Sequence, residues 1–239
     1  MNLLLVQPGE RDSDELVIRG ARAAHIRDVI GATVGQRLRI GLPREAIGTA
    51  AVLQIDDQHV RLGELEVEPI AAGPAIHLIL AVPRPKVLHR MLETAACFGV
   101  SHIDLVNAWR VDKSYFSSPK LTESAIEQQL WLGTEQGRHA WLPTFSLHRM
   151  FVPFIRDFDS QGRHCLLAQP ASGSWMNDRS PLSSQTVIAI GPEGGWIDKE
   201  LGSFERAGFV AISLSESILR SEVALASALA QWELVRRAG

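Results

Sequence analysis

The sequence has no long apolar run and only two cysteines, and these absences exclude several classes of protein. No stretch approaches the ~20 apolar residues that cross a bilayer, so no membrane-spanning helix is expected. Cys97 and Cys165 stand apart, without the paired spacing of a zinc site. Free thiols in a reducing cytoplasm are therefore favoured, and a disulfide is the alternative. The start of the chain lacks the pattern of a signal peptide, which also favours a cytoplasmic protein.

The chain also lacks an excess of positive charge, because its net charge is −3. RNA binding would therefore depend on local basic clusters, for which a solvated charged face is the alternative. The eight histidines show no metal-ligand spacing, so no metal ion is expected. Two windows are basic, and their candidate RNA-binding residues are Arg19, Arg22, Arg27, Arg37 and Arg39 in the first, and Arg84, Lys86 and Arg90 in the second.

Two patterns divide the chain into predicted domains at residues 1–72 and 73–239. The first domain has short apolar runs between glycines, including runs at 59–62 and 65–67, which indicate a small β-barrel or sandwich. A helix at about 21–30 interrupts these runs. The second domain alternates strands at 76–82, 103–106, 165–168, 186–190 and 209–214 with helices, which predicts a mostly parallel α/β sheet. Asp198 is expected to cap the helix at 198–207.

A glycine-rich segment follows one of the buried strands. Ile190 ends an apolar run, and Gly191-Pro192-Glu193-Gly194-Gly195 follows directly. Glycine permits positive φ and close approach of a ligand to the main chain. A phosphate-binding P-loop is excluded because Trp196-Ile197 stands where Lys-Ser/Thr is needed, and the glycine spacing does not fit a dinucleotide fingerprint. Alone, the segment is more often a tight turn after a strand.

A second segment, from Leu214 to Glu222, changes this interpretation. Together, the two segments resemble the C-terminal motifs of SPOUT-class methyltransferases. They are most similar to the bacterial family that methylates N3 of a uridine in small-subunit (16S) ribosomal RNA. Gly191 to Gly195 match the family's glycine loop, and weaker similarity lies at Lys86, Glu135 to Arg138 and His25-Ile26. The second motif is matched at Leu214, Ile218, Leu219, Arg220, Glu222 and Ala224.

The sequence departs from this family pattern at three positions. Ser221 replaces the usual threonine but keeps a hydroxyl group, and Val223 stands where a small hydroxyl residue is frequent. Gly31 lies where a basic residue is common, which places the local RNA contacts in question.

The resemblance implies a fold, a cofactor and an assembly. It implies a C-terminal trefoil knot in the α/β domain, an N-terminal PUA-like barrel that places RNA, and a homodimer. It also implies that three loops bind S-adenosylmethionine, and that the substrate is ribosomal RNA or the small ribosomal subunit. The expected cofactor-binding residues are Ala168, Gln169, Pro170, Ile190, Gly191, Gly194, Gly195, Leu214, Ser217, Ile218, Leu219 and Ala224.

Catalytic candidates follow from the chemistry of uracil N3, which is a weakly acidic imide. A cation near the uracil carbonyls would stabilise the imide anion, and Arg220 is the first candidate for this role. The alternative for Arg220 is a structural ion pair with Glu193 or Glu222. Both glutamates are candidates for accepting the proton or orienting Arg220, although a structural role is favoured for Glu193.

Three other functions compete with uridine-N3 methylation. The first is ribose 2′-O methylation by an enzyme of the same class. The second is a non-catalytic RNA-binding factor for ribosome assembly, which predicts RNA binding without cofactor binding. The third is a small-molecule nucleotide-binding enzyme, and the absence of both phosphate-loop fingerprints disfavours it.

Overall fold

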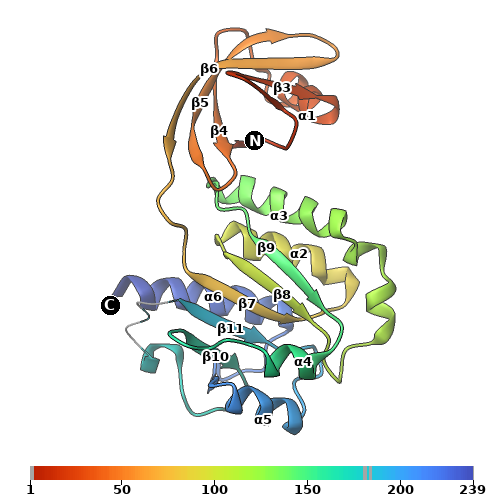
Figure 1. Ribbon diagram of the computed structural model, residues 1–239, viewed down its shortest axis with the longest axis vertical. Helices are drawn as coiled ribbons and strands as arrows, with labels where there is room; N and C mark the ends of the chain where they lie inside the picture. Colours follow the sequence, from red (N-terminus) through yellow and green to blue (C-terminus); the bar gives the residue numbers. More distant parts are fainter. Residues whose placement is uncertain (1–2, 180–181, 183–184, 239) are drawn as a thin grey trace.

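The computed structural model describes residues 3–179, 182 and 185–238, which form two bodies stacked along the long axis (Figure 1). The N-terminal body contains a sheet with the strand order β1-β4-β5-β6-β3-β2. Its pairings are antiparallel, except that β1 runs parallel to β4. The strands are β1 (Leu4–Leu5), β2 (Arg11–Asp12), β3 (Glu15–Arg19), β4 (Arg37–Leu42), β5 (Ala46–Ile55) and β6 (His59–Pro69).

The apolar residues of this sheet surround a core of their own. Leu16, Ile18, Ile40 and Leu62 are completely buried in it. The predicted helix at 21–30 is present as α1 (Gly20–Ala24), followed by a π-helical segment, η1 (His25–Val29). The two runs at 59–62 and 65–67 are one strand, β6, because register shifts in β5 let the pairing continue along its whole length.

The C-terminal body contains a second sheet, with the order β12-β10-β11-β7-β8-β9 and only parallel pairings. The predicted parallel α/β sheet is thus confirmed, although β9 was not expected and β12 is shorter than the run at 209–214. The strands are β7 (Ile76–Ala81), β8 (His102–Val106), β9 (Thr144–His148), β10 (His164–Ala168), β11 (Thr186–Ile190) and β12 (Val210–Ile212).

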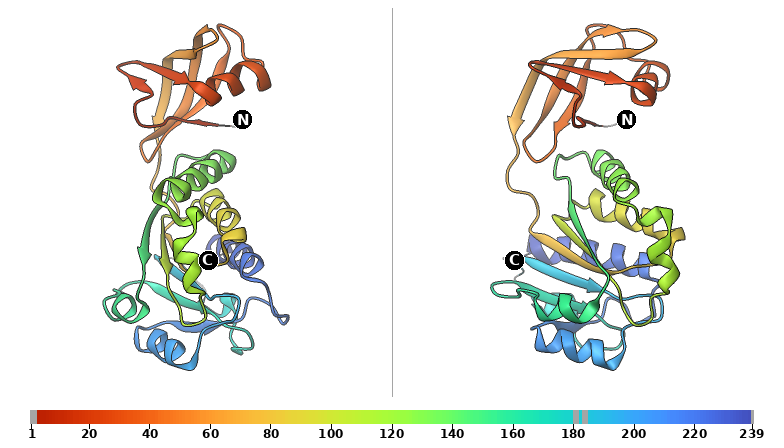
Figure 2. Two further views of the ribbon diagram at one scale, coloured as in Figure 1. Left: turned by 90° about the vertical axis from the view of Figure 1, so that its right-hand side faces the viewer. Right: turned by 45° about the vertical axis from the view of Figure 1, so that its right-hand side comes forward.

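Helices cover both faces of this sheet: α2 and α6 lie on one face and α4 lies on the other (Figure 2). The backbones of α2 and α3 approach closely at Gly133, where a Cβ atom would lie 2.3 Å from the carbonyl oxygen of Glu93. The helices are α2 (Pro85–Cys97), α3 (Glu123–Gly137), α4 (Phe151–Arg156), α5 (Asp198–Arg206) and α6 (Ser221–Ala238), with 3-10 turns η2 (Lys113–Ser117), η3 (Pro119–Leu121) and η4 (Met176–Arg179).

Three smaller expectations are resolved by the structure. Asp198 is the first residue of α5 rather than its cap, because Ile197 occupies the N-cap position. Cys97 and Cys165 are free thiols, so the disulfide is excluded, and burial raises the pKa of Cys165 to about 11. Within the described residues, no helix is long and apolar enough to cross a membrane.

A half-buried glutamate joins the two bodies. Glu135, near the end of α3, accepts hydrogen bonds from the backbone N–H of Leu5 at 3.0 Å and from Arg22 at 3.2 Å. Arg44 adds two bonds across the same junction, from its backbone N–H to Ala140 and from its side chain to Leu142. The orientation of the N-terminal sheet on α3 therefore depends on specific polar contacts.

A polar cluster lies within the parallel sheet, under α4. The carboxylate of Asp104 on β8 is within hydrogen-bond distance of the Nε2 atoms of His77 at 2.7 Å, His102 at 3.2 Å and His148 at 2.7 Å. Burial raises the pKa of Asp104, but the hydrogen bonds from His102 and His77 outweigh it and hold this pKa well below its usual range. His77, His102 and Asp104 also lie close enough to share a metal ion. The absence of a resident metal remains a prediction.

We expect Asp104→Asn to lower the free energy of unfolding by about 2–3 kcal/mol at pH 7, because three half-buried imidazoles lose a buried charged acceptor. The folded-state pKa of Asp104 lies below the value of ~3.9 for an unfolded chain. Its stabilisation is therefore complete above about pH 5 and is lost as the pH falls through the folded-state pKa. Urea unfolding between pH 7 and pH 3 measures this difference.

The exposed Asp157 provides the matched control, because its substitution by asparagine should change stability little. A stability difference for Asp104→Asn that stays constant over the whole pH range would contradict the role given to the carboxylate.

Candidate functional site

A pocket of about 570 Å³ lies at the carboxyl edge of the parallel sheet. Its walls come from the loops that follow β10, β11 and β12, together with the start of α6. These strands are neighbours although other elements separate them in the sequence. The fold brings all twelve predicted cofactor-binding residues to this pocket: Ala168, Gln169, Pro170, Ile190, Gly191, Gly194, Gly195, Leu214, Ser217, Ile218, Leu219 and Ala224.

The glycine loop forms a tight turn at the end of β11. The backbone N–H of Gly195 donates to the carbonyl of Pro192 at 2.8 Å, and Gly195 has a φ of +72°, which favours glycine. At Gly191, a Cβ atom would lie 3.0 Å from the indole nitrogen of Trp196. Glycine at these positions keeps the loop close to its neighbours and leaves main-chain groups at the pocket wall.

Two buried polar atoms of the pocket residues have no hydrogen-bond partner among the described residues. They are the indole Nε1 of Trp196 and the hydroxyl of Ser221. Buried polar groups in folded proteins are almost always satisfied, and unpaired ones require an explanation. A polar ligand in this pocket would supply the missing partners.

The three catalytic candidates occupy different environments. Arg220 is exposed and lines the pocket, and no carboxylate among the described residues forms an ion pair with it. Glu193 accepts a hydrogen bond from the backbone N–H of Arg84 at 3.0 Å, just before α2. Glu222 lies in the first turn of α6 and does not line the pocket. The arrangement leaves Arg220 free and gives Glu193 a structural contact.

Sequence reasoning missed Arg110 and Glu200, which connect the loop after β8 to the pocket. The side chain of Arg110 lines the pocket and donates to the carbonyl of Gly194. Glu200 on α5 is buried and accepts bonds from the backbone N–H groups of Trp109 at 2.7 Å and Ile197 at 2.9 Å. No signal in the sequence links these positions, because they meet only after the strands are ordered in the sheet.

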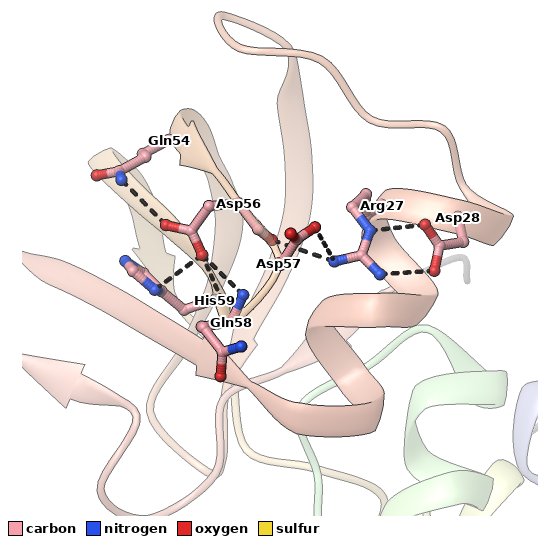
Figure 3. Close-up of polar contacts among 7 residues, drawn as sticks. All are labelled: Arg27, Asp28, Gln54, Asp56, Asp57, Gln58 and His59. Atoms are coloured by element: carbon pink, nitrogen blue, oxygen red, sulfur yellow. Dashed lines mark hydrogen bonds and ion pairs between the residues drawn. The ribbon is translucent and has the colours of Figure 1, made fainter.

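The predicted RNA-binding residues of the N-terminal body divide into paired and free cations. Arg22 bonds to Glu10 and Glu135, and Arg37 pairs with Glu66 at 3.1 Å. Arg27 lies between Asp28 and Asp57 (Figure 3). Among the described residues, Arg19 and Arg39 form no ion pair and are exposed.

In the second cluster, only Arg84 has an acidic partner among the described residues, because its Nε atom lies 3.9 Å from Glu193. Lys86 and Arg90 on α2 are exposed and unpaired within the same part of the chain. Of the predicted RNA-binding residues, four therefore have no acidic partner in the described part of the chain: Arg19, Arg39, Lys86 and Arg90.

A larger cavity of about 1230 Å³ lies between the N-terminal body and α3. Arg22, His25, Arg44 and Glu135 contribute to its walls. None of the predicted cofactor-binding residues borders it, so the smaller pocket is the better candidate for the chemical site despite its size.

The chain and its fold are similar to those of known proteins. The chain is 28% identical over 243 residues to the ribosomal RNA small subunit methyltransferase E of Treponema pallidum, covering 96% of this chain and 90% of that protein. The fold matches a probable rRNA methyltransferase from Porphyromonas gingivalis, with a TM-score of 0.82, 21% identity, and coverage of 100% and 99%. It also matches a ribosomal RNA small subunit methyltransferase E from Neisseria gonorrhoeae bound to S-adenosyl methionine, with a TM-score of 0.81, 18% identity, and coverage of 98% and 97%.

A family model provides the assignment. The model for an RNA methyltransferase domain matches residues 71–233, which include the whole parallel sheet and the pocket at its carboxyl edge. This match spans well over half of the chain. The chain therefore belongs to the RNA methyltransferase domain family.

Proposed function

We propose that this protein uses S-adenosylmethionine to methylate N3 of a uridine in 16S ribosomal RNA of the small subunit. The observation that carries the proposal is the pocket of three loops, in which the glycine loop and the segment from Leu214 to Arg220 face one space. Membership of the RNA methyltransferase family and the similarity to proteins named ribosomal RNA small subunit methyltransferase E support it.

The residues present fit this cofactor. A pocket of about 570 Å³ is within the range of small-molecule sites. Main-chain groups of the glycine loop and of Leu214 to Leu219 would hold the adenosine and methionine parts. The unpaired indole nitrogen of Trp196 and hydroxyl of Ser221 offer hydrogen bonds that a polar cofactor could complete. Once bound, the cofactor supplies a methyl group on a positively charged sulfur.

The protein's own contribution to the chemistry is positioning and charge stabilisation. Methylation requires N3 of uracil to lose its proton, and the bound cofactor would supply the methyl group that the nitrogen then receives. A guanidinium that is free of ion pairs and lines the pocket can stabilise negative charge on the uracil carbonyls, and Arg220 meets both conditions. Glu222 does not line the pocket, so orienting Arg220 is the better supported of its two predicted roles, while the bond between Glu193 and Arg84 supports a structural role for Glu193.

The proposal also covers the wider architecture. Residues 1–72 would form a PUA-like barrel that places RNA, and residues 73–239 would form the SPOUT domain of a cytoplasmic enzyme. In that domain the C-terminal part of the chain would form a trefoil knot. A homodimer would complete the assembly. Light scattering tests the dimer, and an experimental trace of residues 164–238 tests the knot.

Gly195→Ala should weaken binding of S-adenosylmethionine by about 5- to 30-fold, because a side chain at φ +72° costs about 1–2 kcal/mol. Calorimetric titration of the cofactor measures this change. Gly202→Ala on α5 is the matched control, since a Cβ atom there meets only the end of the Arg206 side chain. Equal affinities for the two variants would remove the glycine loop from the cofactor site.

Arg220→Ala should lower the rate of methyl transfer by about 100- to 1000-fold while cofactor affinity changes little. The assay supplies labelled cofactor to small ribosomal subunits that lack the modification, and nucleoside mass spectrometry identifies the product. We expect 3-methyluridine. Arg206→Ala, on the exposed side of α5, is the control.

Each other outcome of this assay has a distinct meaning. A 2′-O-methyl nucleoside would replace uridine-N3 methylation with ribose methylation. No transfer together with no cofactor binding would leave a non-catalytic RNA-binding protein. Full activity in Arg220→Ala would remove Arg220 from the mechanism but keep the reaction.

Replacing Lys86 and Arg90 together by alanine should weaken RNA binding and reduce the slope of log affinity against log salt by about 1.5, because each phosphate contact contributes ~0.7–0.9. Filter binding at several salt concentrations measures the slope. Arg22→Ala should leave the slope unchanged and instead lower thermal stability, since Arg22 bonds to Glu10 and Glu135. An unchanged slope for the double variant, together with a reduced slope for Arg22→Ala, would instead assign the RNA contact to the basic residues of the N-terminal body.

A further inference from the structure

The carboxyl edge of the parallel sheet has two halves. The loops after β10, β11 and β12 form the pocket, while the loops after β7, β8 and β9 form the adjoining half (Figure 1). Each strand of this second half is followed within a few residues by an exposed arginine: Arg84 after β7, Arg110 after β8 and Arg149 after β9. The cofactor would occupy only the first half.

Trp109 lies in the segment between β8 and β9. Its side chain is the most exposed aromatic group among the described residues, at 79%. The residues on either side of Trp109 are instead held in place by the fold. Ala108 and Val111 are buried, and the backbone N–H of Trp109 donates to the buried carboxylate of Glu200 at 2.7 Å. The indole is therefore held in solvent on a backbone that these contacts fix.

The loop of Trp109 is joined to the pocket on one side and to the loop after β9 on the other. The adjacent residue, Arg110, lines the pocket and bonds to the carbonyl of Gly194. Asn107 donates to the carbonyl of Arg149 at 3.0 Å, and the guanidinium of Arg149 lies over the ring of Phe116. A base held against Trp109 would thus lie near the mouth of the pocket.

The charges around Trp109 favour an anionic partner. Among the described residues, Arg110, Lys113 and Arg149 form no ion pair. Three acids near this loop are already engaged: Glu200 bonds to backbone N–H groups, Glu193 bonds to Arg84, and Asp112 caps the η2 turn. Cationic side chains without acidic partners beside an exposed indole are the combination that binds single-stranded nucleic acid, with phosphates on the cations and a base on the ring.

We propose that Trp109 is a stacking platform for an unpaired base of the substrate RNA, with Arg110 and Arg149 contacting the flanking phosphates. This inference rests on the proposed RNA methylation and adds the part of the surface that receives the substrate. An indole presents a flat π-face that an aliphatic side chain lacks. If the base stacks on the ring, phenylalanine should replace Trp109 better than leucine does, whereas simple apolar contact would allow either.

The experiment compares Trp109→Ala, Trp109→Leu and Trp109→Phe in methyl transfer to small ribosomal subunits that lack the modification. Loss of one stacked base lowers kcat/KM by about 5- to 150-fold. We expect this loss for alanine and leucine and most of the activity for phenylalanine, with the effect appearing mainly in KM. Cofactor affinity by calorimetry and thermal unfolding should match the unaltered protein. Val152→Ala, an exposed apolar position on α4, should have no effect.

Several results would overturn the inference. One is full activity in Trp109→Ala, and another is equal activity of the leucine and phenylalanine variants. Loss of cofactor binding would indicate a structural role, and conversion to a smaller oligomer in light scattering would assign the indole to a contact between copies of the chain. If the unaltered protein transfers no methyl group to RNA, the proposed function itself fails, and that result is distinct from all the others.

Discussion

The parallel direction of all six strands in the second sheet is the constraint on which the rest of the site depends. Because every strand runs the same way, all six carboxyl ends meet at one edge. Each loop that follows a strand can then contribute to a common surface, as is usual in α/β sheets. The strand order decides which loops become neighbours, so the glycine loop and the segment after β12 face one pocket.

This edge is held by polar contacts that each join elements distant in sequence. Glu200 binds the loop after β8 to the start of α5, and Arg110 binds that loop to the glycine loop. Glu193 binds the glycine loop to the start of α2. These contacts fix main-chain positions around the pocket, while Arg220 remains free of acidic partners within the described residues. A wall fixed by these contacts, together with a guanidinium that has no acidic partner among the described residues, suits an enzyme that positions substrates and stabilises charge.

The same edge explains how a protein with a net charge of −3 could bind RNA. Most arginines of the first basic window are neutralised by neighbouring carboxylates, as in the group around Arg27 (Figure 3). The arginines that follow β7, β8 and β9 lie beside the pocket instead. Local placement of a few cations therefore matters more than the total charge.

The sequence by itself determined the class of fold and the glycine loop, because alternating apolar runs and glycines are local signals, whereas the pocket residues were predicted from the resemblance of two motifs to a known family. It also identified Arg220 through its place in a motif. The tertiary structure alone decided that β9 joins the sheet, that Arg22 serves the junction with Glu135, and that three histidines surround Asp104. It likewise placed Trp109 beside the pocket. These features arise from pairing between strands and loops far apart in the chain, and no spacing within the sequence encodes which of them become neighbours.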